Sequence, residues 1–254
     1  MKHLKRIYWS DTTKPGLHYY DFESETVNDF VVHGLISPLG IAVDSGNRKV
    51  YWTDYGTHTV KRSDIEGTNI EILVENLLMP RHIALDLHNN KIYWTDSKDN
   101  LVQTANMDGS EYEILVKDIP GAGIALDINQ GKMYWADCFE AKGNYRANID
   151  GTDIELINKH LKVQVGVTLH ENKIYWADSD ADKIQRSNLD GSSVEDVITK
   201  GTGPRCLAID PHSLKLYWTG LESDTIYRSN LDGTNINEVV KGFGGPRGIA
   251  LYFE

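Results

Sequence analysis

Tyr8-Trp9-Ser10-Asp11 is the stretch that decides the fold, because it recurs along the whole chain at intervals of 41 to 43 residues. Its later copies are Tyr51-Trp52-Thr53-Asp54, Tyr93-Trp94-Thr95-Asp96, Tyr134-Trp135-Ala136-Asp137, Tyr175-Trp176-Ala177-Asp178 and Tyr217-Trp218-Thr219-Gly220. All six tryptophans of the chain belong to these copies. A repeat of this length predicts one supersecondary unit per copy, arranged in a stack or a ring.

Each copy lies within a longer repeated pattern. An apolar run such as Gly40–Val43 precedes it, and a half-polar run that ends in a turn such as Asp190-Gly191 follows it. Asp-Gly is a strong hairpin signal because it tolerates positive φ. A final short run such as Ile70–Val74 completes the unit. Four short strands in about 42 residues are typical of a propeller blade.

The two ends of the chain are incomplete in complementary ways. The first unit begins at Lys5–Asp11 without an apolar first strand, and the chain ends on an unpaired apolar run, Gly245–Leu251. A solenoid would instead carry polar caps at both ends. Pairing the two ends removes both free edges. We therefore predict an all-β fold, a single six-bladed propeller domain of four-stranded antiparallel blades over residues 1–254, whose ring closes when a C-terminal strand at about 243–254 joins the N-terminal blade.

These residues resemble the YWTD family, also called the low-density lipoprotein receptor class B repeat family, over essentially the whole chain. The resemblance rests on six motif copies in phase with the Asp-Gly turns. It implies a six-bladed propeller in which the Ile-Ala-Val run is the innermost strand and the Tyr-Trp run is the second. The sequence departs from the pattern at three places: Gly220 replaces the motif aspartate, Thr104 replaces the repeat arginine, and Tyr19–Ser24 replaces the Arg-Ser-Asn-Leu-Asp-Gly segment.

Composition argues against several classes of function. The net charge of −11 is opposite to what nucleic acid or anionic lipid would require. The only cysteines, Cys138 and Cys206, are too few for a disulfide framework. The sequence has no apolar signal segment, so we expect a cytoplasmic protein as the sequence stands, and an extracellular one if it has been trimmed. We expect a monomer without membrane insertion, metal or cofactor.

The five motif aspartates are expected to form a ring with a structural role. A carboxylate at a strand end can accept hydrogen bonds from turn amides or pair with an arginine of the repeat. The aspartates are Asp11, Asp54, Asp96, Asp137 and Asp178, and the candidate arginines are Arg62, Arg146, Arg186 and Arg228. The motif aromatics are likewise expected to be core residues.

Function is expected where the repeats differ, in the top-face loops over the mouth of the central channel. His82 and Cys206 are the clearest departures, because the other four blades carry glycine at the equivalent position. The candidate binding residues are Tyr55, His58, Arg81, His82, Phe139, Gln164, Arg205, Cys206 and Arg247.

Two functions fit these loops. The resemblance implies a module that recognises a protein, a peptide or a small ligand, and a mixture of tyrosine and arginine suits such recognition. The alternative is a metal-independent lyase, hydrolase or cyclase acting on a small molecule. In that case His82 and Cys206 are the candidate catalytic residues, with the imidazole as general base and the arginines stabilising an anion. A structural scaffold is the third possibility.

Overall fold

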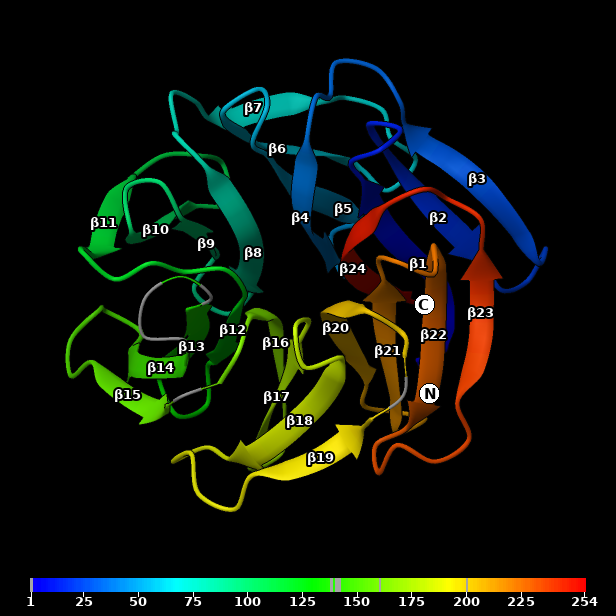
Figure 1. Cartoon of the computed structure of the whole chain (residues 1–254). Helices are drawn as coiled ribbons and strands as arrows, with labels where there is room; N and C mark the ends of the chain where they lie inside the picture. The colour runs from blue at the N-terminus through cyan, green and yellow to red at the C-terminus, as the bar shows by residue number, and fades with distance from the viewer. Residues whose placement is uncertain (1, 138, 140–142, 160, 200) are drawn as a thin grey trace.

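The computed structural model describes residues 2–137, 139, 143–159, 161–199 and 201–254. Within them the chain forms six four-stranded sheets, whose strands all pair antiparallel. The sheets stand in a ring (Figure 1), and their innermost strands surround a central channel. The predicted six-bladed propeller is confirmed. No helix in the described part of the chain is long and apolar enough to cross a membrane.

The first three blades follow the chain from its N-terminus, and each is given from its inner to its outer strand. Blade 1 contains β24 (Pro246–Phe253), β1 (Leu4–Asp11), β2 (Gly16–Asp21) and β3 (Thr26–Val31). Blade 2 contains β4 (Pro38–Asp44), β5 (Lys49–Asp54), β6 (Thr59–Asp64) and β7 (Glu71–Val74). Blade 3 contains β8 (Pro80–Asp86), β9 (Lys91–Asp96), β10 (Leu101–Asn106) and β11 (Glu113–Val116).

The remaining three blades continue around the ring in the same order. Blade 4 contains β12 (Ile124–Asp127), β13 (Lys132–Asp137), β14 (Gly143–Asn148) and β15 (Glu155–Asn158). Blade 5 contains β16 (Gln164–His170), β17 (Lys173–Asp178), β18 (Lys183–Asn188) and β19 (Glu195–Ile198). Blade 6 contains β20 (Pro204–Asp210), β21 (Lys215–Gly220), β22 (Thr225–Asn230) and β23 (Asn237–Lys241).

The core is divided among the interfaces between blades. Each Tyr-Trp strand has a neighbouring blade on both of its faces, which explains why it reads as a continuous buried run and not as an alternation. Trp52 of β5, for example, packs with Tyr8 and Tyr252 of blade 1. All six tryptophan side chains are fully buried. The expectation that the motif aromatics are core residues is confirmed.

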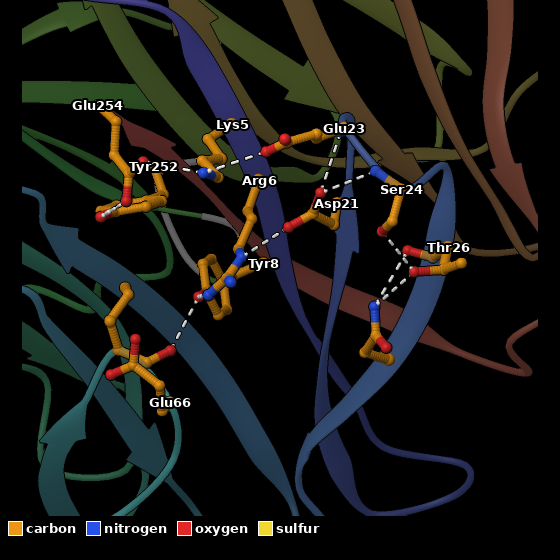
Figure 2. Close-up of polar contacts among 12 residues, drawn as sticks. Lys5, Arg6, Tyr8, Asp21, Glu23, Ser24, Thr26, Glu66, Tyr252 and Glu254 are labelled. Carbon is orange, nitrogen blue, oxygen red and sulfur yellow. Dashed lines mark hydrogen bonds and ion pairs between the residues drawn. The ribbon is translucent and has the colours of Figure 1, made fainter.

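Strand β24 closes the ring by pairing with β1, as predicted. Ile7 lies opposite Leu251 and Trp9 lies opposite Ile249. A group of charged side chains covers this junction. Lys5 lies between Glu23 and Glu254 (Figure 2), with its Nζ atom 3.3 Å and 2.9 Å from their carboxylates. Arg48 of the next blade also contacts Glu254, at 3.0 Å, so that blades 1 and 2 are joined through the C-terminal residue.

The motif aspartates bind turn amides, as expected. The carboxylate of Asp54 accepts hydrogen bonds from the backbone N–H groups of Ile36, Ser37, Gly56 and Thr57. It therefore joins the loop before β4 to the turn after β5. Asp96 and Asp178 bind the loops of their own blades in the same way.

Of the repeat arginines considered as the other partners of these aspartates, Arg62, Arg146 and Arg186 pair with glutamates. Arg62 pairs instead with Glu71 of the outer strand. The reason is register, because Arg62 lies directly opposite Glu71 across β6 and β7. In blade 6, where Gly220 replaces the aspartate, the Asp182 carboxylate of blade 5 accepts from the backbone N–H groups of Thr202 and Gly203 at 3.1 and 2.8 Å.

Candidate functional site

Six inner strands surround the channel, and four of them contribute a glycine at the same level. Gly40, Gly166 and Gly248 line a cavity of about 60 Å³ together with His82 and Cys206, and the fourth glycine, Gly123, lies directly before β12. A Cβ atom on Gly40 would lie 2.7 Å from the Cα of His82, and one on Gly166 would lie 2.7 Å from the Cα of Cys206. The glycines therefore allow neighbouring inner strands to approach each other closely.

His82 and Cys206 contact each other inside the channel. They belong to blades 3 and 6, which are opposite in a ring of six, and the His82 Nε2 atom lies 3.2 Å from the Cys206 Sγ atom. A cavity of about 60 Å³ holds only about two water molecules. The pair and the glycines thus form a narrow floor, and a larger ligand has to lie above it.

Burial keeps both members of this pair uncharged at neutral pH. It lowers the pKa of His82 from 6.5 to about 3, and the charges of Arg81, Arg247 and Arg205 act in the same direction. Burial raises the pKa of the Cys206 thiol to about 12, against the opposite effect of the same three arginines. The contact is therefore between a neutral imidazole and a neutral thiol, and the imidazole tautomer decides which atom donates.

Three arginines surround the pair from blades 3, 6 and 1. The Arg81 Nε atom donates to the Ser97 hydroxyl at 2.7 Å, and the Arg247 Nε atom donates to the Thr12 hydroxyl at 3.1 Å. The pKa of Arg247 is lowered, first by burial and next by the charge of Arg205. The positive charges of Arg205 and Arg81 thus add to the effect of burial, while Asp11 acts in the opposite direction.

Hydroxyl groups of the repeated motif hold these inner strands in place. The Thr219 hydroxyl accepts from the backbone N–H of Cys206 at 3.1 Å and donates to the carbonyl of Arg247, in the next blade, at 2.7 Å. Thr53 makes the equivalent bond to the carbonyl of Arg81. This role was not predicted, although serine or threonine occupies the third motif position in four of the six copies.

The remaining predicted residues lie in different environments. Tyr55 and His58 lie in the turn between β5 and β6, with ring centroids 6.0 Å apart, and the His58 Nδ1 atom lies 3.0 Å from the Leu78 carbonyl. Phe139 is exposed, and its ring lies 5.0 Å from the Arg81 guanidinium carbon. Gln164 is fully buried and donates to Asp178 at 3.4 Å.

Two further features concern the second cysteine and possible metal ligands. Cys138 lies outside the part of the chain that the structure describes. Within that part, no three histidine, cysteine, aspartate or glutamate side chains gather in a way that could hold a metal ion.

The chain was compared with known proteins. Residues 48–87, 90–128 and 172–211 match the low-density lipoprotein receptor repeat class B family. Low-density lipoprotein receptor-related protein 5 from Mus musculus is 32% identical over 69 residues, which are 26% of this chain and 4% of that protein. Nidogen-2 from the same organism is 30% identical over 70 residues, 27% of this chain and 5% of that protein. The matching segments thus span only a small part of either relative.

The comparison of folds covers nearly the whole ring. Nidogen, in its crystal structure as a nidogen/laminin complex, superposes with a TM-score of 0.85 at 20% identity, and the match covers 97% of each chain. At this level of identity the likeness concerns the fold.

Proposed function

Because this chain is built from low-density lipoprotein receptor class B repeats, we propose that it is a protein-binding module that holds an acidic segment of a partner over the channel mouth. The observation that carries this proposal is the group of three arginines, Arg81, Arg205 and Arg247, around a floor made by His82 and Cys206. A carboxylate placed there would accept charge-assisted hydrogen bonds and reduce the mutual repulsion of these positive charges.

The character of the surrounding surface supports recognition of a peptide. Phe139 and Tyr55 are exposed aromatic side chains on this face, and aromatic residues with arginine dominate the energetics of protein interfaces. Arginine binds carboxylates through two parallel N–H groups, which fixes the orientation of the bound group. Since the floor is closed to larger groups, the partner would lie across the mouth and would not thread through the channel.

The similarity of this fold to that of nidogen also supports a protein as the class of partner. Nidogen, which shares the fold, was solved in complex with laminin. That observation belongs to nidogen, and it supports a protein as the proposed class of partner.

A peptide array tests the proposal. Wild-type protein is applied to immobilised peptides that contain aspartate and glutamate, and to matched peptides with asparagine and glutamine at the same positions. We expect binding to the acidic set, and a loss of at least about tenfold in Arg205→Ala, since charge-assisted hydrogen bonds contribute about 1.5–3 kcal/mol. Lys241→Ala, which removes the same charge from an outer strand, is the control. Equal binding to the neutral set, or by Arg205→Ala, contradicts the proposal.

A second candidate function is catalysis of a reaction on a small anion at the channel mouth. The observation that favours it is the His82–Cys206 contact. The neutral imidazole could accept the thiol proton when an anionic substrate enters among the arginines. Alkylation by iodoacetate, in which the sulfur displaces iodide, tests this in a Cys138→Ser background. If the site is an enzyme site, iodoacetate, which is anionic, should react faster than neutral iodoacetamide in the protein that retains His82. Equal rates with the two reagents count against it.

A further inference from the structure

The outer halves of neighbouring blades are joined by a repeated arginine contact. In blade 2, the Arg62 Nε atom donates to the Glu71 carboxylate at 2.6 Å, and its Nη1 atom donates to the Met107 carbonyl of blade 3 at 2.7 Å. Two further blades repeat this contact. Arg146 binds Glu155 and the Leu189 carbonyl, and Arg186 binds Glu195 and the Leu231 carbonyl. In each case a guanidinium group lies between one blade and the next.

Blade 3 keeps the acceptors but has no arginine at the equivalent position. Thr104 occupies the arginine position, directly opposite Glu113 in the register of β10 and β11. Its hydroxyl donates to the Ile92 carbonyl at 2.9 Å, within its own blade. In the part of the chain that the structure describes, no ion pair or hydrogen bond reaches the Glu113 carboxylate, and no side chain donates to the Ile149 carbonyl, which is equivalent to that of Met107.

A cavity of about 460 Å³ lies between blades 3 and 4 at this position. Its lining residues are Asn89, Lys91, Tyr93, Thr104, Glu113, Leu115, Ile149 and Asp150. The Tyr93 ring is equivalent to the ring of Tyr175, which lies 5.9 Å from the Arg186 guanidinium carbon in blade 5. The cavity therefore offers a carboxylate, a carbonyl and an aromatic ring in the arrangement that holds a guanidinium group in the sister blades.

The charge of the cavity also favours a cation. Hydrogen bonds from Ser110 lower the pKa of Asp108, with a contribution from Arg62 of the preceding blade. Asp150 is the equivalent turn residue at the cavity. Hydrogen bonds from Thr152 lower its pKa, and the positive charge that acts in the same direction is that of Lys132, in its own blade. Lys91 is the cation that lines the cavity, and its Nζ atom lies 3.9 Å from Glu111. The lining thus contains two carboxylates, Glu113 and Asp150, and one lysine.

We propose that the cavity between blades 3 and 4 binds a guanidinium group, supplied either by an arginine side chain of a partner chain or by a small guanidinium compound. The group donates to the Glu113 carboxylate and to the Ile149 carbonyl, and it lies against the Tyr93 ring. Arginine is preferred over lysine because its planar fork of N–H groups reaches both acceptors at once. The site lies on the outer strands, away from the channel mouth, and is independent of the function proposed above.

Titration of the intact protein with arginine amide, followed by NMR, tests this site. We expect saturable shifts of the Thr104 and Glu113 amide signals, with lysine amide binding at least about tenfold more weakly. Glu113→Gln should weaken arginine amide at least about fivefold. Glu71→Gln is the matched control, because Arg62 already fills the equivalent place in blade 2, and it should leave binding unchanged. Failure of arginine amide to bind wild type, or equal binding of lysine amide, overturns the proposal.

A second variant tests whether an arginine at position 104 of this chain fills the same site. Thr104→Arg supplies the guanidinium from within, so it should raise the melting temperature and abolish binding of arginine amide. Unchanged binding in a folded Thr104→Arg protein overturns the proposal. Methylguanidinium and an arginine-containing peptide distinguish the two sources. If the peptide binds about tenfold more tightly than methylguanidinium, the natural ligand is an arginine of a partner chain. If the two bind equally, it is a small compound.

Discussion

The His82 Nε2 atom lies 3.2 Å from the Cys206 Sγ atom, although 124 positions separate the two residues in the chain. Each replaces the glycine of its repeat, and the two repeats are three blades apart in a ring of six. Two side chains that enter a narrow channel from opposite sides must meet. The floor of the candidate site is therefore a consequence of two coordinated departures from the repeat.

Removing one member of this pair should expose the other. In a Cys138→Ser background, His82→Gly restores the repeat glycine and opens the floor beside Cys206. We expect the thiol to react with an anionic disulfide reagent at least about tenfold faster than in the parent protein, because access and the nearby arginines then both favour reaction. Absorbance of the released thiolate gives the rate, and a Cys206→Ser protein provides the blank. No acceleration would show that His82 does not cover the thiol.

The buried imidazole should make stability depend on pH. The pKa of His82 is lowered from 6.5 to about 3, first by burial and then by the arginines. Between these values the unfolded chain takes up a proton that the native protein does not, so stability is fully present above about pH 6.5 and declines as pH falls toward 3. The drop in melting temperature from pH 7 to pH 4 should be smaller in His82→Gly than in wild type. An equal drop contradicts this assignment.

The hydroxyl of Thr219 should contribute to stability through both of its hydrogen bonds. Thr219→Val keeps the shape of the side chain but leaves the Cys206 N–H and the Arg247 carbonyl without their buried partner. Unsatisfied buried groups of this kind cost about 1–3 kcal/mol. Urea unfolding should show a lower midpoint with an unchanged slope, which identifies a change in stability alone. A midpoint equal to that of wild type would show that these two groups find other partners.

The motif tryptophans should affect stability and leave ligand binding unchanged. Trp52 is fully buried between blades 1 and 2, and large-to-alanine changes at such positions cost about 3–5 kcal/mol. We expect Trp52→Ala to lower the melting temperature markedly, while the protein that remains folded binds acidic peptides with the affinity of wild type. Weaker peptide binding without a loss of stability would instead place Trp52 in the ligand site.

The sequence was sufficient for the fold and for part of the site. Six copies of one motif predicted six blades, and the complementary ends predicted closure by β24. His82 and Cys206 stood out because a side chain replaced glycine. Their mutual contact depends on which blades are opposite each other, which becomes evident only once the ring is built.

Other features could not be predicted because they depend on partners in another blade. Nothing in the spacing of the motif indicated that Asp182 of blade 5 would serve the loop beside Gly220. The pairing of Arg62 with Glu71 follows from strand register, which a pattern of residue types leaves open. The cavity between blades 3 and 4 could likewise not be predicted, because its meaning depends on the contacts that arginine makes at the same position in other blades.

Calorimetric titration with the best acidic peptide from the array tests the central claim most directly. Wild type is compared with the Arg205→Ala/Arg247→Ala double variant at low and at high salt. The account predicts affinity that falls with salt in wild type and is lost in the double variant, whose melting temperature should remain close to that of wild type. Undiminished, salt-independent binding by the folded double variant would contradict the assignment of the channel mouth as the binding site.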